Sequence, residues 1–296
     1  MKHPGVPHPS ALHDTHAQPD DRNVVLERVG VTRLAIPIRI LERSGGVQHV
    51  SALAGIFAEL QPALKGAHLS RLVELMTGCA NQPIGREEIF KMLQDARARL
   101  DSPCAEINLH FGFFVPRHAP VTRLVAPQRY RCLLRGRSDA RGYVFQLGLQ
   151  VPITTLCPCS KSISDRGAHS QRAFVSVGLT YTRAAPIWFE DLIDLVEEQG
   201  SAPVVPILKR LDEKFVSEHA YNNPKFVEDV VRDVIIAIKQ GVDGFDSLSV
   251  ECESQESIHA HNAYAMTRES AVATDDDYFD ALRWSGSFGA SSAPLP

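Results

Sequence analysis

The stretch YVFQLGLQVPITTLCPCSKSISDRGAHSQRAFVSVGLTY, residues 143–181, sets two alternating apolar segments on either side of a polar one. Apolar residues recur at every second position from Tyr143 to Ile153 and again from Ala173 to Tyr181. This period of two predicts two strands that each bury one face. The connection between them carries thiols, an imidazole and basic side chains. Reactive groups on a loop between rigid flanks are a common way to build an active site.

The order of elements around this stretch occurs twice along the chain. In the first half the predicted strands are 33–40, 50–60, 106–114 and 124–134, and the predicted helices are 68–77 and 86–100. In the second half, helices at about 188–199 and after Asn222-Asn223, with Pro224 at the first helical position, precede strands at 246–254 and 257–267. Two strand-strand-helix-helix-strand-strand units predict an α+β fold with antiparallel sheets and helices on one face.

The length of 296 residues allows two domains of ordinary size. We expect a disordered N-terminal tail over 1–22 and a first module over 23–138. A second module over 139–270 would carry the thiols and the imidazole, and a C-terminal tail would cover 271–296. Both tails are poor in large apolar residues and rich in Pro, His, Asp or Ser.

Composition excludes several classes of protein. The net charge of −4 argues against a nucleic-acid partner. The absence of an apolar run of about 20 residues argues against a membrane span, and the polar N-terminus argues against a secretory signal. We therefore expect a cytoplasmic protein with reduced cysteines. The sequence has no P-loop, GxGxxG turn or GxSxG elbow, which disfavours kinases, dehydrogenases and α/β-hydrolases.

Cys157 and His169 lie at the two ends of the connection between adjacent predicted strands, so they can converge. Thiolate and imidazole together suit Zn²⁺ or a similar divalent metal. A catalytic metal usually has three protein ligands, and the third could be Cys159 or a carboxylate from 209–214. The alternative for the two cysteines is burial as small apolar side chains.

A second group of ionisable side chains surrounds the last predicted strand pair. In ideal strands Glu251 and Glu253 share a face, His259 and His261 share a face, and Glu256 falls at the turn between them. A carboxylate beside an imidazole can transfer protons near neutral pH. The alternative is the solvated polar face of a hairpin.

Two further features suit a nucleotide. Glu228 could accept two parallel N–H bonds from a guanine edge, or it could pair with Arg232 one helical turn away. The segment Lys65-Gly66-Ala67-His68-Leu69-Ser70-Arg71 enters a predicted helix and suits an anion such as phosphate, with Lys161, Arg166 and Arg172 adding positive charge. The alternative for this segment is an ordinary solvated helix start.

The segment Leu156–Lys161, followed by Gly167-Ala168-His169 and Gln171-Arg172, resembles the signature of the type IB GTP cyclohydrolase I family. Other stretches resemble further motifs of that family, namely 65–71, 209–214, 220–229 and 256–261. Together the matching stretches span about residues 30–268.

This resemblance implies the tunnelling fold and a homotetramer with active sites between subunits. It implies conversion of GTP and water to 7,8-dihydroneopterin triphosphate and formate, which opens folate and pterin biosynthesis. One divalent metal per active site, Zn, Mn or Fe, would be held by Cys157, His169 and Glu213. Glu228 would anchor guanine. The residues implied near the reacting ring or as proton carriers are Glu256, His259 and Cys159. Those implied for the triphosphate are Lys65, His68, Ser70, Arg71, Lys161 and Arg172.

Two other functions remain compatible with these residues. A tunnelling-fold nitrile reductase of queuosine synthesis would use a cysteine nucleophile with NADPH and no metal. A non-catalytic purine- or pterin-binding protein would bind GTP without releasing formate.

Overall fold

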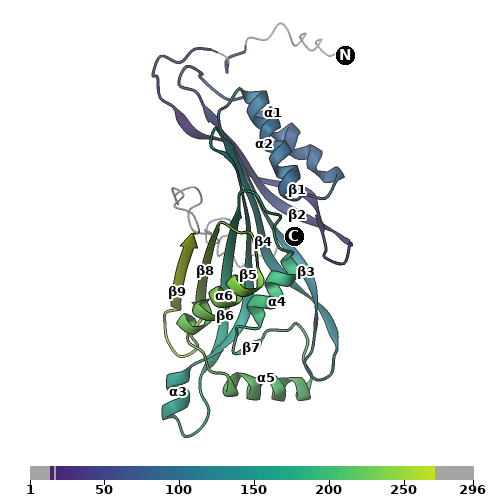
Figure 1. Cartoon of the computed structure of the whole chain (residues 1–296), viewed down its shortest axis with the longest axis vertical. Coiled ribbons are helices and arrows are strands. Elements are labelled where there is room, and N and C mark those ends of the chain that lie inside the picture. The colour runs from purple at the N-terminus through teal and green to yellow at the C-terminus, as the bar shows by residue number, and fades with distance from the viewer. Residues whose placement is uncertain (1–13, 17, 271–296) are drawn as a thin grey trace, which may run out of the picture.

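The computed structural model describes residues 14–16 and 18–270, without the side chains of 79 and 80. Its main feature is one antiparallel sheet in the order β1-β2-β3-β4-β5-β6-β8-β9, with the short β7 paired to β5 (Figure 1). The strands are β1 (Leu26–Leu41), β2 (Val47–Leu60), β3 (Ala105–His118), β4 (Val125–Asp139), β5 (Gly142–Leu156), β6 (Ser170–Tyr181), β7 (Ala202–Pro203), β8 (Ser247–Ser254) and β9 (Ala263–Ser270). The predicted antiparallel α+β architecture is confirmed.

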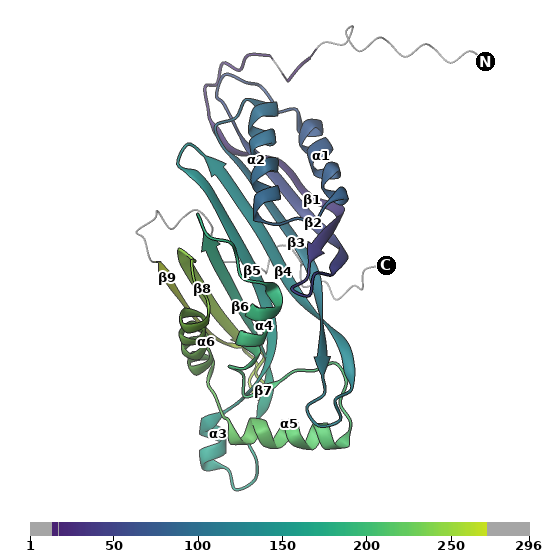
Figure 2. The ribbon, with the colours of Figure 1, turned by 45° about the vertical axis from the view of Figure 1, so that its right-hand side comes forward.

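Helices occupy the connections between the inner strands. They are α1 (Leu69–Thr77), the 3-10 helix η2 (Gly78–Asn81), α2 (Arg86–Leu100), α3 (Pro158–Ile163), α4 (Phe189–Glu197), α5 (Arg210–Asn222) and α6 (Val227–Gly241). The apolar face of α2 packs on β3 and β4, and α6 packs on β8 and β9 (Figure 2). Side chains from both halves of the sheet and from α1, α2, α4 and α6 form one continuous apolar core.

The register of β5 and β6 positions the polar connection between them. Alternate residues of both strands are buried, as the period of two predicts. Pairing runs from Phe145 with Tyr181 to Leu156 with Ser170. Cys157 therefore follows the last ladder pair directly, and His169 precedes it.

In the second half, one predicted helix and one predicted strand begin at the wrong residue. The second-half helix does not begin at Pro224, because α5 ends at Asn222 and α6 begins only at Val227. The Asp229 carboxylate accepts a hydrogen bond from the Phe226 N–H at 3.0 Å, which caps α6 at that point. The last strand does not begin at residue 257, since its ladder starts with Ser254 opposite Ala263. Residues 255–262 form a loop instead.

Part of the predicted N-terminal tail contacts the folded chain. Residues 14–16 and 18–22 run beside the loop before α1, with backbone hydrogen bonds to residues 63–66. The predicted C-terminal tail lies outside the described residues. In the described part of the chain, no helix has both the length and the apolar character needed to cross a membrane.

Candidate active site

Cys157 and His169 close the loop between β5 and β6. The Cys157 N–H donates to the His169 carbonyl at 3.1 Å, which sets the two residues side by side. Cys157 is also the N-cap of α3, where its Sγ accepts the Ser160 N–H at 3.4 Å. Cysteine sulfur is a common ligand of Zn²⁺ and similar metals. The half-buried Cys157 sulfur therefore suits a divalent metal.

The His169 ring is oriented by its Nδ1 atom. Nδ1 lies 2.9 Å from Gln171 Oε1 and 3.8 Å from Glu256 Oε2. Because both neighbours are oxygen acceptors, we assign the proton to Nδ1, which makes Nε2 the ring nitrogen for a metal. An oxygen partner on the second nitrogen is the usual arrangement at a metal-ligating histidine. The side chains of His169 and Glu256 are only 11% and 10% exposed, so the group is shielded from water.

Gln171 contacts both His169 and Glu256, although it was not predicted as a site residue. Its Nε2 lies 3.4 Å from Glu256 Oε1 and 3.3 Å from Thr155 Oγ1, and its Oε1 accepts the Ser257 hydroxyl at 3.3 Å. The sequence feature that could have predicted this role is the spacing between Gln171 and His169. Gln171 follows His169, the residue just before β6, by two positions, and residues two apart in an extended chain point to the same side.

The loop 255–262 brings Glu256 and His259 to this position. The Gln255 N–H donates to the Arg172 carbonyl at 2.9 Å, which ties the loop to β6. The His259 ring meets the His169 ring edge-on at 6.2 Å and stacks on His261 at 5.2 Å. His259 and His261 were predicted to share a strand face, which is wrong because both lie in the loop.

Glu251 and Glu253 of β8 belong to a different set of contacts. Tyr264 donates its hydroxyl to Glu251 Oε2 at 2.9 Å, and Asn262 donates to Glu253 Oε1 at 2.7 Å. Of the acidic residues predicted around the last strand pair, Glu256 is thus the one that contacts His169.

Glu213 is exposed in the first turn of α5. The start of α5 is held against the β3–β4 loop by the neighbouring residue, Asp212. The neighbouring Asp212 carboxylate accepts the N–H groups of Val121 and Thr122 at 2.8 and 2.9 Å, and the Thr122 hydroxyl at 2.6 Å. Burial by itself would raise the pKa of Asp212. These hydrogen bonds and one from the Lys209 N–H lower the pKa by more than burial raises it, so the pKa of Asp212 lies below its ordinary value. Asp212 therefore stays ionised and fastens α5 to the β3–β4 loop.

Cys157, His169 and Glu213 do not form a closed ligand group within one chain. Among the described residues, the group of three whose ligand atoms all lie within 4.8 Å of one another is Asp14, His16 and His68. Glu213 as the third metal ligand stays a prediction. Cys159 is exposed on α3, one residue beyond the α3 N1 position.

Three of the residues predicted to contact the nucleotide, Lys161, Arg172 and Glu228, lie on elements near the end of β5 and the start of β6. Lys161 donates to the Tyr221 carbonyl and lies 4.4 Å from the Tyr221 ring centroid, which joins α3 to the end of α5. Arg172 is exposed at the start of β6. Glu228 is exposed in the first turn of α6, and Arg232 pairs with Asp229 at 3.2 Å.

The charge of Glu228 acts on a buried cysteine of β8, Cys252. Burial, with the charges of Glu228 and Glu253 adding to the effect, raises the pKa of the Cys252 thiol to about 12. Glu228 is thus one of two charges that act on Cys252 of β8, the strand that leads into the loop carrying Glu256.

The predicted phosphate motif lies at the other end of the molecule. It leads into α1, and α1 and α3 occupy opposite ends of the long axis in both views (Figures 1 and 2). Lys65 Nζ donates to Gln18 Oε1 at 2.9 Å, His68 Nε2 lies 3.3 Å from Asp14 Oδ2, and Arg71 donates to the Arg99 carbonyl at 2.8 Å. Ser70 is exposed in the first turn of α1. A single chain does not bring this motif to Cys157.

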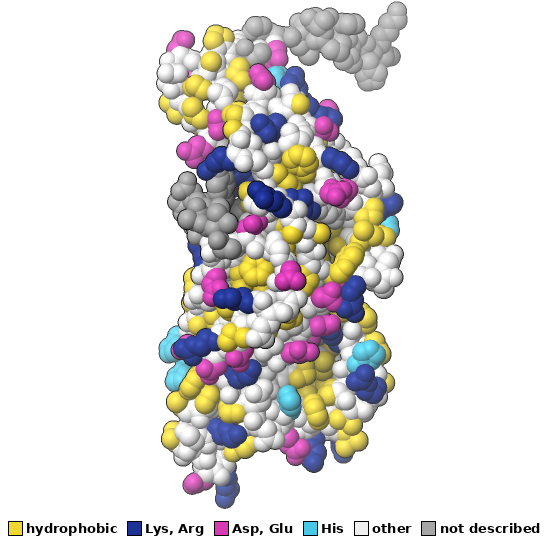
Figure 3. Space-filling model, viewed as in Figure 1, with side chains coloured by type: hydrophobic (Ala, Val, Ile, Leu, Met, Phe, Trp, Pro, Cys, Tyr) yellow, Lys and Arg dark blue, Asp and Glu magenta, His cyan; other side chains and the backbone are white. Residues whose placement is uncertain are grey.

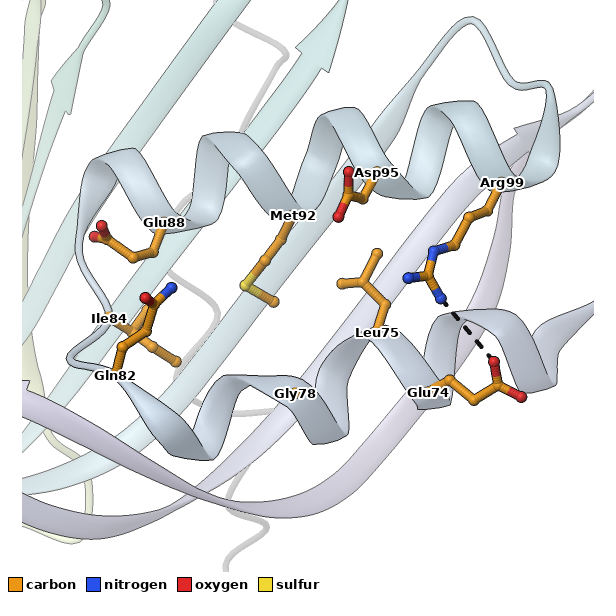
Figure 4. A pocket seen from close by; sticks show the side chains of 9 residues that line it. All are labelled: Glu74, Leu75, Gly78, Gln82, Ile84, Glu88, Met92, Asp95 and Arg99. Carbon is orange, nitrogen blue, oxygen red and sulfur yellow. Dashed lines mark ion pairs between the residues drawn. The ribbon is translucent and has the colours of Figure 1, made fainter.

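A hollow of about 260 Å³ lies between α1 and α2 (Figure 4). Its lining includes Glu74, Glu88, Asp95 and Arg99, and Arg99 lies 4.0 Å from Glu74. None of the residues predicted for the active site lines it. The molecular face in Figure 3 intersperses basic and acidic side chains without a large patch of one sign.

Comparison with known proteins gives a consistent result. Residues 12–265 match the family model of type I GTP cyclohydrolase folE2. The chain is 42% identical over 255 residues to GTP cyclohydrolase FolE2 of Syntrophotalea carbinolica, covering 86% of this chain and 94% of that protein. It is 41% identical over 254 residues to the FolE2 protein of Pseudothermotoga lettingae, covering 86% and 97%.

Solved structures support the fold. A hyper-thermostable AgUricase mutant has a TM-score of 0.52 at 6% identity, covering 86% of this chain and 94% of that chain. A uricase from Bacillus fastidious has a TM-score of 0.50 at 8% identity, covering 89% and 100%. Uricases are tunnelling-fold proteins, so the predicted tunnelling fold is confirmed.

Proposed function

Because the chain belongs to the type I GTP cyclohydrolase folE2 family, we propose that it converts GTP and water to 7,8-dihydroneopterin triphosphate and formate, the first step of folate biosynthesis. The observation that carries the proposal is the loop between β5 and β6. There a thiol at a helix N-terminus and an oriented imidazole meet a shielded carboxylate. The names of the relatives support this substrate and reaction.

One divalent metal, Zn, Mn or Fe, is the proposed cofactor. Cys157 Sγ and His169 Nε2 would hold it, with Glu213 as the third ligand. This mixed set of soft and hard donors accepts each of the three metals. When bound, the metal would bring the pKa of its water to about 7, so that hydroxide is available at neutral pH. Gln171 and Glu256 keep the His169 ring in the required tautomer.

The remaining residues bind the base and move protons. The Glu228 carboxylate accepts two N–H bonds from the guanine edge and sets the base in register. Ring opening and formate release require several proton transfers, each accelerated about 10²–10⁴-fold by a placed acid or base. Glu256 and His259 lie beside His169 and are the proposed carriers, with exposed Cys159 as a third.

The triphosphate would be bound between two neighbouring subunits. Lys161 lies on α3, which Cys157 caps, and Arg172 lies at the start of β6. The segment 65–71 leads into α1, which lies at the opposite end of the same chain from α3. A homotetramer with active sites at its interfaces would join the two groups. We propose that each subunit consists of two modules, 23–138 and 139–270. We also propose that the protein is cytoplasmic.

The proposal is tested by turnover of the metal-stripped enzyme. Purified protein is treated with a chelator, supplied with GTP and then with Zn²⁺, Mn²⁺ or Fe²⁺, and the fluorescent oxidised pterin and formate are measured. We expect both products only after metal is added. Full turnover without metal would exclude the mechanism, and GTP binding without formate would favour a binding protein. Product dependent on NADPH would favour a nitrile reductase.

The neighbouring cysteines provide a matched pair of variants. Cys157→Ala should lose both metal and turnover, because it removes a ligand. Cys159→Ala should retain metal, since its thiol is exposed on α3. Metal content is measured by elemental analysis of folded protein. Retention of metal by Cys157→Ala would assign the thiolate ligand to Cys159.

A further inference from the structure

The segment before β1 is fastened to the loop that precedes α1. The Asp20 N–H donates to the Ala63 carbonyl at 3.1 Å, and Lys65 N–H donates to Gln18 O at 3.1 Å. Gly66 N–H donates to His16 O at 3.3 Å. A Cβ at position 66 would lie 2.8 Å from His16 Cδ2, so the close approach of His16 depends on this glycine. The main chain therefore holds His16 against the loop.

Three side chains with metal-ligating atoms meet where these segments touch. Asp14 Oδ2 lies 3.3 Å from His68 Nε2, and Asp14 Oδ1 lies 3.9 Å from His16 Nδ1. One ligand atom from each residue lies within 4.8 Å of the others. Atoms bound to one metal at about 2.0–2.2 Å lie roughly 3–3.6 Å apart, so a small closure would suffice.

The ring geometry agrees with two imidazoles facing a common point. The centroids of His16 and His68 are 5.2 Å apart and the planes are inclined by 47°, so the rings are not stacked. An exposed ion pair between Asp14 and His68 would be worth only about 0–1 kcal/mol and would not require the second histidine. Two imidazoles and one carboxylate are a common ligand set for a divalent transition metal.

We propose that Asp14, His16 and His68 bind a second divalent transition-metal ion, of the Zn²⁺, Co²⁺ or Ni²⁺ class, which clips the N-terminal segment to the loop before α1. Three ligands come from two segments that are distant in sequence, so the ion cross-links them. This site leads into α1 and is separate from Cys157 beside α3 (Figure 1). His68 is also among the residues proposed to bind the triphosphate of a neighbouring subunit, so the metal site is tested without GTP.

The test is a Co²⁺ titration of full-length, metal-free protein without GTP, followed by calorimetry and absorption. Cobalt bound to Cys157 gives a thiolate charge-transfer band, whereas cobalt at the N-terminal site gives none. The charge-transfer band therefore reports on the Cys157 site alone. Binding without the band reports on the N-terminal site, so either proposal can fail while the other holds. We expect His16→Ala to bind Co²⁺ at the thiolate-free site at least about tenfold more weakly, since even outer-shell changes cost 10–100-fold. Metal should also protect the segment from proteolysis in the wild type and not in His16→Ala.

The histidines further toward the N-terminus provide the matched control. Replacement of His3, His8 and His13 by Ala in the full chain should leave this binding unchanged. His16 is exposed, so His16→Ala keeps the folded core intact. Unchanged affinity in His16→Ala would overturn the proposal. So would loss of the thiolate-free site in the triple variant, because the tail would then be its source.

Discussion

Gln48 and Gln171 occupy the same place in the two halves of the sheet, each the second residue of a strand. Gln48 in β2 is a structural clamp, whose amide exchanges hydrogen bonds with the Phe114 backbone at 2.6 and 3.0 Å. Gln171 in β6 instead bonds to His169, Thr155 and Glu256. The same scaffold position thus serves the fold in one module and the site in the other.

The preceding connection explains the difference. The β1–β2 turn is short and closes with a Glu42 N–H bond to the Gly46 carbonyl at 2.9 Å, with Gly45 at a φ of +88°. The β5–β6 connection from Cys157 to His169 is long enough to contain α3. Two similar ladders therefore present different chemistry, because only the second carries a loop that can hold reactive side chains. Three experiments address this contrast.

The largest expected effect concerns a histidine buried in the first module. Burial lowers the pKa of His110 on β3 to about 4, with the Arg135 charge adding to the effect. The unfolded chain binds this proton near pH 6.5, so stability is full above pH 6.5 and falls as pH drops toward 4. We expect a loss of about 2–3 kcal/mol over this window, absent in His110→Gln.

Urea unfolding at pH 7 and pH 4.5 measures this difference. His118→Gln is the matched control, because His118 lies exposed at the end of the same strand. Its pH dependence should equal that of the wild type. An equal slope in His110→Gln would show that other groups cause the acid sensitivity.

The next effect compares the two glutamines directly. Gln171→Leu should weaken metal affinity about 10–100-fold, because it removes the oxygen that orients the His169 ring. Gln48→Leu should leave metal affinity unchanged and lower the free energy of unfolding by about 1 kcal/mol. Metal titration and urea unfolding of both variants check this. Similar metal affinity in the two variants would contradict the assigned roles.

The smallest effect concerns the helix layer of the first module. A Cβ at Gly136 of β4 would lie 2.4 Å from Ile89 Cγ2 and 3.0 Å from Leu93 Cδ1 of α2. Gly136→Ala should therefore cost about 1 kcal/mol of stability while metal affinity stays unchanged. Gly78→Ala is the control, with no atom within 4 Å of its Cβ and a φ of −67°. Equal melting temperatures for the two variants would show that α2 can shift away from the added methyl group without loss of stability.

Much of the fold was predictable because its signals are local. The period of two predicted the strands, and apolar faces predicted α1, α2 and α4 close to their observed bounds. The polar helix α5 was missed, since Ala220 is the one apolar residue of α5 that is fully buried. Its start depends on Asp212, which caps the helix and binds the distant residues Val121 and Thr122.

The sequence by itself determined the alternating strands, the reactive loop between β5 and β6 and the family to which its motifs point. Only the tertiary structure decided which side chains meet. Gln171 contacts Glu256 across 85 positions because β6 pairs with β8 and the following loop folds back. Asp14 reaches His68 only through the pairing of two loops. Periodicity reports the nearest neighbours along a chain, whereas contacts between distant residues depend on strand register and loop path.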